Sequence, residues 1–203
     1  MGRPREHDAS TRLALSAAAE RLVAEGGPGA LSVRSVASEV GTTTRAVYSV
    51  FGSKDGLVDA LAQRAFELLQ ARMDELPETD DPVGDLVEAG ASAFRGFVLG
   101  HPSLFRIAFQ RVVPGLRAGP ELTEARRGAL ARLEARIQRV KDAGFLGRKS
   151  VRQAALEFNA MCEGLANAEL RGTTLRILPE GEEELAWRHG LETLVRGFRA
   201  GAA

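Results

Sequence analysis

Hydrophobic residues recur along this chain every three or four positions, within long blocks that are separated by prolines and glycines. This spacing places apolar side chains on one face of an α-helix. Leu15, Ala18, Ala19 and Leu22 form such a face in a first helix expected from about residue 9 to 25, which the following Gly-Gly-Pro-Gly ends.

The same spacing continues to the end of the chain. It predicts a short helix capped by Ser32 and ended by Gly41, another before the next glycine, and a longer one from Lys54 to about Leu76. Five more helices are expected after residue 80, the last two over about 150–172 and 182–200. With no convincing strand or repeat, the sequence predicts an all-α fold of about nine helices.

The composition indicates a globular protein and argues against a membrane protein or a disulfide-bonded secreted one. The chain has 203 residues, of which 44% are hydrophobic and 27% charged, as in ordinary globular domains. No apolar run exceeds three residues, so a membrane span is not expected. The charged N-terminus lacks the apolar stretch of a secretory signal, and the single cysteine excludes an intrachain disulfide. We expect a cytoplasmic protein.

Candidate enzyme chemistry is sparse. The three histidines are scattered, and Cys162 falls on an apolar stripe where a buried side chain is expected. The chain contains no Gly-rich phosphate loop, nucleophile elbow or zinc-ligand spacing. We therefore predict no catalytic residue, no metal site and no cofactor.

The segment 31–61 carries the strongest functional pattern. Two short helices joined by a Gly-containing turn are typical of a helix-turn-helix, whose second helix enters the DNA major groove. The formal net charge is zero, so DNA binding must rest on local placement. Lys54 opens the next helix, where the ammonium group and the helix N-terminus favour phosphate. The expected DNA-contacting residues are Thr42, Thr43, Thr44, Arg45, Tyr48, Ser49 and Lys54.

Two function classes fit these residues taken alone. One is a DNA-binding regulator. The other is an all-helical carrier or adaptor of small molecules, since helix-turn-helix folds occur in proteins that bind no DNA and a Thr-rich turn can simply cap a helix. A salt-dependent gel shift separates the two, because only a regulator prefers its own site strongly.

Residues 12–61 resemble the TetR-type transcriptional regulators. The pattern Val-Ala-x-x-x-Gly at 36–41 is followed by Tyr-x-x-Phe-x-Ser-Lys-Asp-x-Leu at 48–57. The resemblance implies that the third helix reads an operator, that Tyr48 and Lys54 hold phosphates, and that the protein is a homodimer on palindromic double-stranded DNA. Two positions depart from the pattern: Val50 replaces a frequent histidine, and Arg45 stands where a small residue is common, which suggests a different base preference.

The resemblance also implies three regions: a DNA-binding domain over 1–54, a connecting helix and loop over 55–79, and a ligand-binding and dimerisation domain over 80–203. A repressor released by a small apolar effector is the expected function. The motif His101-Pro102-x-Leu104-Phe105-Arg106 is similar to that of one subgroup, but Asn159 and Glu163-Gly164 replace that subgroup's Trp and His-Gly pair, so the effector stays unidentified.

Two further expectations concern the C-terminal region. Small residues on the last two long helices, such as Gly164 and Gly197, allow close helix approach and predict the dimer interface. Most phenylalanines also lie in this region, where they fit either an effector pocket or ordinary core. The pocket candidates are Phe94, Phe97, Phe105, Phe109, Phe145, Phe158 and Met161.

Overall fold

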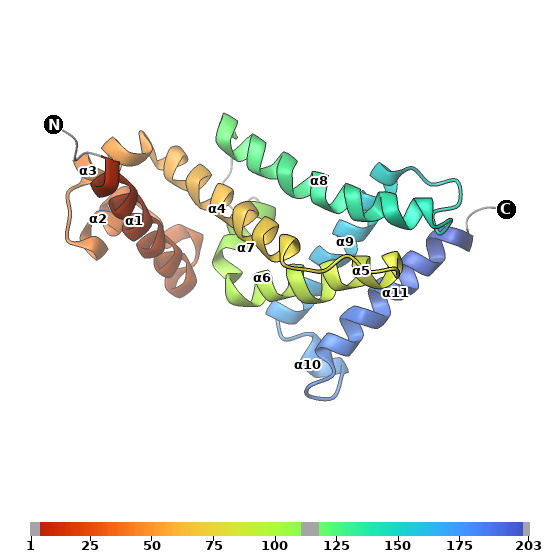
Figure 1. Ribbon diagram of the computed structural model, residues 1–203. Coiled ribbons are helices and arrows are strands. Elements are labelled where there is room, and N and C mark those ends of the chain that lie inside the picture. Colours follow the sequence, from red (N-terminus) through yellow and green to blue (C-terminus); the bar gives the residue numbers. More distant parts are fainter. Residues whose placement is uncertain (1–4, 111–117, 201–203) are drawn as a thin grey trace. The chain divides into compact units, whose positions relative to one another are not determined.

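The computed structural model describes residues 5–110 and 118–200, and these residues form helices without any strand (Figure 1). The α-helices are α1 (Arg5–Gly26), α2 (Val33–Val40), α3 (Thr44–Phe51), α4 (Lys54–Asp74), α5 (Pro82–Glu88), α6 (Arg95–Gly100), α7 (Pro102–Phe109), α8 (Pro120–Asp142), α9 (Val151–Leu170), α10 (Thr174–Ile177) and α11 (Glu183–Ala200). A π-helical segment (Ala89–Phe94) joins α5 to α6. The all-α prediction is confirmed.

The described residues divide into two compact units, the first from the ranges 5–66, 101–110 and 118–125 and the second from 67–100 and 126–200. In the first unit, α1 packs against α2, α3 and α7. Leu15, Ala18 and Val23 of α1 are fully buried, which explains the apolar spacing in the sequence. His101, just before α7, approaches Glu20 of α1 with 2.9 Å between Nδ1 and Oε1.

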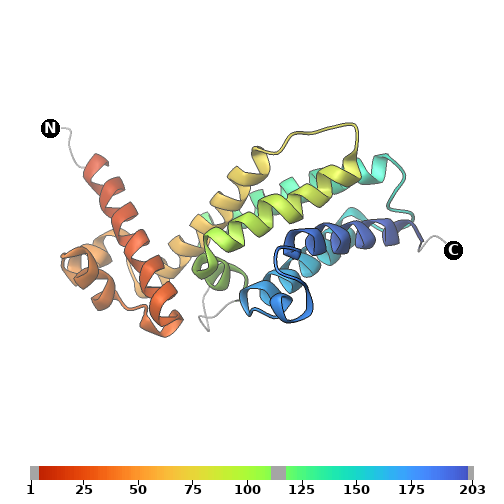
Figure 2. The same cartoon turned by 90° about the horizontal axis from the view of Figure 1, so that it is seen from below.

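The second unit is organised around α9 and α11, which lie side by side (Figure 2). The helix formed by α5, the π segment and α6 packs against α11. Trp187 of α11 is buried, with its ring centroid 6.4 Å from that of Phe94. Its indole N–H donates to Glu169 of α9 at 2.8 Å, and the same carboxylate accepts from Arg95 at 2.7 Å. These bonds satisfy polar groups that would otherwise be costly to bury.

Gly90, within the π segment, is closely packed against α9 and α11. A Cβ atom built on Gly90 would come within 2.4 Å of Leu191 Cδ1 and 3.1 Å of Cys162 Sγ. Only glycine therefore lets this helix approach α9 and α11 at that point. The extra residue of a π turn is a local change of register that helix spacing does not reveal.

The chain between α4 and α5 is attached to α8. Asp85 is 6% exposed and accepts from both the backbone N–H and the hydroxyl of Thr79 at 2.8 Å. Arg139 Nη1 of α8 donates to the same carboxylate at 2.5 Å. Burial acts to raise the pKa of Asp85, but the bonds from Thr79 and Arg139 outweigh it and hold that pKa below its usual value.

The predicted helix boundaries differ from the structure in three places. α1 begins at Arg5, earlier than the expected residue 9. The four-residue α10 and the π segment were not predicted. The prolines and glycines at 114–120 also predict a loop, of which residues 114–117 lie outside the described residues.

Candidate nucleic-acid interface

The α2–α3 pair is built by local capping. Ser32 and Ser35 form a reciprocal capping box at the start of α2, and Gly41 ends this helix at φ 70°. Few residues other than glycine adopt that left-handed conformation without strain. Thr43 then caps α3, its hydroxyl accepting from the Ala46 N–H at 3.2 Å. The sequence thus encodes two short helices with a sharp turn between them.

The inner faces of this pair are apolar. Val36 and Ala37 of α2 and Val47 and Phe51 of α3 are buried. α2 and α3 pack on each other and on α1. Because the inner residues are fixed, the polar residues of α3 are held on its opposite, outer face.

The residues expected to contact DNA lie together on this outer face. Thr43, Thr44, Arg45 and Ser49 are exposed, Tyr48 is 50% exposed, and Thr42 is partly exposed. Thr43 also serves as the cap of α3, as the alternative interpretation expected. An exposed tyrosine and guanidinium beside hydroxyls form a surface suited to phosphates and base edges.

The first turn of α4 begins at Lys54, three residues after the end of α3 in the sequence. Ser53 Oγ accepts the Gly56 N–H at 2.9 Å, and Ser53 and Lys54 are exposed. The positive end of the helix and the ammonium group of Lys54 therefore occur together in the first turn. Asp55 in the same turn partly offsets that charge.

Arg12 is a positioning residue that the sequence patterns did not reveal. Its Nη2 donates to the backbone oxygen of Val50 at 3.1 Å, and its guanidinium carbon lies 5.2 Å from the ring centroid of Phe51. A cation at a helix C-terminus is favourable, so Arg12 holds the last turn of α3 against α1. Apolar spacing gives no sign of this role, because Arg12 stands in the sequence only as the first residue of the stretch that resembles the TetR-type regulators.

The seven pocket candidates occupy different surroundings. Phe105 and Phe109 belong to the first unit, where their rings stack at 5.4 Å. The other five belong to the second unit. Of these, Phe94, Phe97 and Phe158 are buried, whereas Met161 and Phe145 line two different hollows. An effector pocket lined by these residues stays a prediction.

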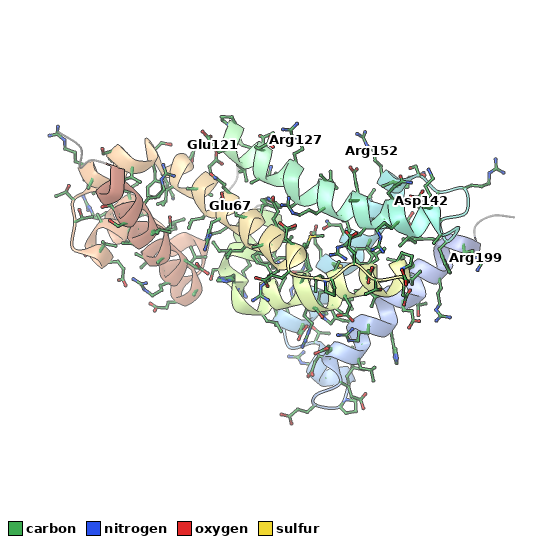
Figure 3. The ribbon with its side chains drawn as sticks, in the orientation of Figure 1. Glu67, Glu121, Arg127, Asp142, Arg152 and Arg199 are labelled. Atoms are coloured by element: carbon green, nitrogen blue, oxygen red, sulfur yellow. The ribbon has the colours of Figure 1, made fainter. Side chains whose placement is uncertain are left out.

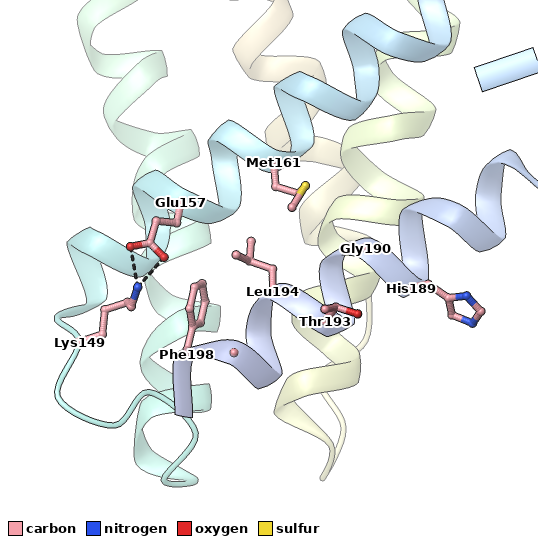
Figure 4. A pocket seen from close by; sticks show the side chains of 9 residues that line it. Lys149, Glu157, Met161, His189, Gly190, Thr193, Leu194 and Phe198 are labelled. Atoms are coloured by element: carbon pink, nitrogen blue, oxygen red, sulfur yellow. Dashed lines mark hydrogen bonds and ion pairs between the residues drawn. The ribbon is translucent and has the colours of Figure 1, made fainter. Parts of the chain in front are cut away.

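One hollow of about 630 Å³ lies between α9 and α11 (Figure 4). Met161 and Leu194 project into it, and His189 also contributes to its lining. Lys149 bonds both oxygens of Glu157 at 2.5–2.6 Å and lies 4.8 Å from the ring centroid of Phe198. The second hollow, also about 630 Å³, is lined by residues of α5 and α11 together with Phe145.

Other chemistry is limited within the described residues. Cys162 is buried, and that burial raises the pKa of its thiol, which disfavours the reactive thiolate. Across residues 5–110 and 118–200, no group of three or more His, Cys, Asp or Glu side chains is placed to hold a metal ion. None of the helices described here combines the length and apolar character needed to cross a bilayer.

Comparison with known families accounts for both halves of the chain. The family model "Bacterial regulatory proteins, tetR family" matches residues 15–61, and the model "Tetracyclin repressor-like, C-terminal domain" matches residues 87–194. The HTH-type transcriptional regulators Rv1816 of Mycobacterium tuberculosis and Mb1846 of Mycobacterium bovis are each 32% identical over 107 residues, 51% of this chain and 45% of theirs. The chain thus spans about half the length of the curated relatives it matches.

Solved structures share the fold over nearly the whole chain. A protein of unknown function from Rhodococcus sp. RHA1 is 25% identical, with a TM-score of 0.77 over 97% of this chain and 98% of that one. The TetR family transcriptional regulator PfmR from Thermus thermophilus is 21% identical, with a TM-score of 0.67 over 90% of this chain and 97% of its own. At that identity, the likeness to PfmR concerns the fold alone.

Proposed function

Because the chain belongs to the TetR family of DNA-binding transcriptional regulators, we propose that it acts as a homodimeric repressor. In this proposal it leaves a palindromic operator when a small, mainly apolar effector binds. Residues 1–54 form the DNA-binding domain, 55–79 the connection, and 80–203 the effector-binding and dimerisation domain. The observation that carries the proposal is the exposed polar face of α3, fixed by its buried inner face.

The residues of the interface have separate roles in this proposal. Lys54 and Tyr48 bind phosphates and supply affinity, since an ammonium and a phenol at the rim of α3 and α4 suit oxygen anions. Thr44 and Arg45, exposed in the first turn of α3, supply sequence choice. A guanidinium in the major groove pairs with guanine O6 and N7, which distinguishes one base pair from the others.

A dimer is needed because one short recognition helix makes few base contacts. Two copies related by a two-fold axis bind two half-sites about 34–36 Å apart, or a multiple of that spacing. The surface of α9 and α11 supports this role. Leu156 is 71% exposed, and Gly164 and Gly197 leave room along the two helices.

Effector control acts through α4 in this proposal. The helix is continuous from Lys54, at the DNA-facing surface, to Asp74, whose carboxylate accepts from Arg132 of α8 at 2.6 and 2.7 Å. An effector that binds one arrangement of α4 and α8 more tightly shifts the population toward it. A displacement of a few ångströms then suffices to lose the half-site spacing.

The DNA-binding part is tested with two variants of exposed residues. Lys54→Ala removes one phosphate contact per subunit, so it should weaken binding to all sequences similarly and reduce the slope of log K against log salt by about one per subunit. Arg45→Ala should cost roughly 1–3 kcal/mol at one base pair and relax the preference there.

Both variants are measured by fluorescence anisotropy on a selected site and on scrambled DNA, at several salt concentrations. If Arg45→Ala leaves the ranking of bound sequences unchanged, Arg45 does not read bases. If the wild-type protein binds selected and scrambled DNA equally, the proposed operator binding is wrong and a carrier or adaptor function takes its place.

A further inference from the structure

Among the described residues, Arg136 of α8 is the only buried arginine, and its guanidinium contacts the end of α4. The residue is only 6% exposed. Its Nη2 donates to the backbone oxygens of Met73 at 3.1 Å and Leu76 at 3.2 Å. The Met73 carbonyl lies in the last turn of α4, where a positive charge is favourable, and the Leu76 carbonyl lies two residues beyond the end of that helix. The side chain therefore joins α8 to the end of the connecting helix.

The other amino group of this side chain has no acceptor. Arg136 Nη1 is buried and finds no hydrogen-bond partner among the described residues. Burial of a guanidinium N–H without an acceptor is costly, and such a group in a folded protein calls for a partner.

Two neighbouring arginines on the same side of α8, unlike Arg136, form hydrogen bonds to carboxylates. Arg132, four residues earlier, bonds the carboxylate of Asp74, and Arg139, three residues later, bonds that of Asp85. Arg136 lies between them and is the least exposed of the three, and its Nη2 bonds go to backbone carbonyls rather than to a carboxylate. By contrast, Arg127 of the same helix is exposed and projects outward (Figure 3). The hydrogen bond from Arg132 and, to a smaller extent, the charge of Arg136 lower the pKa of Asp74, so Arg136 has a carboxylate nearby. What Arg136 lacks is a hydrogen-bond acceptor for Nη1.

We propose that Arg136 Nη1 binds an oxygen anion carried by the effector, and that the effector is accordingly a small apolar molecule with a carboxylate group. A guanidinium is suited to carboxylate oxygens. Buried apolar residues lie on the same stretch of the two helices, Met73 on α4 and Val140 one turn further along α8, and favour an apolar body. This assignment of effector class rests on the proposed effector-controlled repressor.

The site also connects binding to control. The guanidinium that receives the carboxylate is the one that bonds the Met73 and Leu76 carbonyls. When Nη1 turns to a ligand oxygen, the two bonds from Nη2 must adjust with it because the group is planar and rigid. The effector therefore acts directly on the end of the helix whose other end starts at Lys54.

The test uses octanoate and 1-octanol, which share an eight-carbon chain and differ in the carboxylate. Isothermal titration of the free full-length protein measures the affinity for each probe, without DNA. The wild type should bind octanoate at least tenfold more tightly than 1-octanol. Arg136→Met, which keeps an unbranched apolar stem and removes the guanidinium, should remove that preference and leave the affinity for 1-octanol unchanged.

Arg132→Met is the matched control, because it removes an arginine that already has a carboxylate partner. It should retain the octanoate preference. If Arg136→Met does not fold, Arg136→Lys replaces it. A single ammonium group lacks the planar, forked geometry that lets a guanidinium hold two backbone carbonyls and a ligand oxygen at once. The preference of this variant for octanoate over 1-octanol should therefore fall at least fivefold.

Three results overturn the assignment: no octanoate binding, equal binding of the two probes by the wild type, or a preference that persists without Arg136. In those cases a buried water is the partner of Nη1. Operator binding is measured separately on the same preparations. Its loss with octanoate binding intact contradicts the proposed repressor alone, and the converse contradicts only the Arg136 site.

Discussion

Gly164 on α9 and Gly197 on α11 allow a sharp test of the dimer interface. In the single chain, a Cβ atom built on either glycine meets nothing within 4 Å, and neither has the positive φ that disfavours other residues. Alanine is favoured over glycine inside a helix by about 1 kcal/mol. Considered as a monomer, each Gly→Ala variant should therefore be more stable by about that amount.

If a second copy of the chain packs against these two glycines, each Gly→Ala substitution should instead weaken the dimer. Each substitution adds a methyl group twice per dimer, because a two-fold interface repeats every contact. Overpacking a close interface costs roughly 1–3 kcal/mol per site. The gain in helix propensity is the same in the folded monomer and in the dimer, so it does not enter the dissociation equilibrium. Two sites at a cost of at least about 1 kcal/mol each therefore raise the dimer dissociation constant about 30-fold or more.

The assay is sedimentation equilibrium over a concentration series, with urea unfolding at low protein concentration as the measure of monomer stability. Ala135→Gly, on the exposed side of α8, is the control for helix propensity. It should lower stability by about 1 kcal/mol and leave dimerisation unchanged. If Gly164→Ala and Gly197→Ala both stabilise the protein and leave the dissociation constant unchanged, the interface does not use these faces.

Two further predictions concern stability. Gly56→Ala should destabilise the protein despite its better helix propensity, because its Cβ would come within 2.0 Å of the Phe51 backbone oxygen and displace the end of α3. That displacement should also weaken binding to all DNA sequences. Urea unfolding measures the stability and fluorescence anisotropy measures the binding; a stabilised variant with intact binding would contradict this reasoning. Asp85→Asn should cost about 2 kcal/mol at pH 7. Since folding lowers the pKa of Asp85, its stabilising effect is complete above the unfolded value near 3.9 and is lost as the pH falls below it. The difference in unfolding free energy between the wild type and Asp85→Asn, measured in urea, should therefore shrink as the pH falls below about 3.9, and a constant difference would refute this origin.

Apolar spacing and caps were sufficient to predict most of the fold. Ser32 caps α2 and Gly41 ends it, as the sequence indicated, because these features depend on residues within one turn. The π segment was not predicted, since a π turn leaves no mark in apolar spacing, and the close contact of Gly90 within it is with Leu191, about a hundred residues away in the chain.

The DNA-contacting face could be placed from the sequence, whereas the effector site could not. The exposed face of α3 follows from helical spacing, so residues such as Arg45 could be placed there from the sequence. Phenylalanines at helical spacing look alike whether they form core or a pocket, so the effector site could not be located. Arg136 resembles any charged residue of α8, because its burial and the partners of its neighbours depend on segments some 60 residues away.

Selection of bound DNA from a random double-stranded library tests the central claim most directly. The purified wild-type protein should enrich an imperfect palindrome whose half-sites are one helical turn, or a multiple of it, apart. Enriched sites should bind at least a thousandfold more tightly than unselected DNA at physiological salt. Selection that yields no shared sequence, with binding that depends only on salt, would contradict the account.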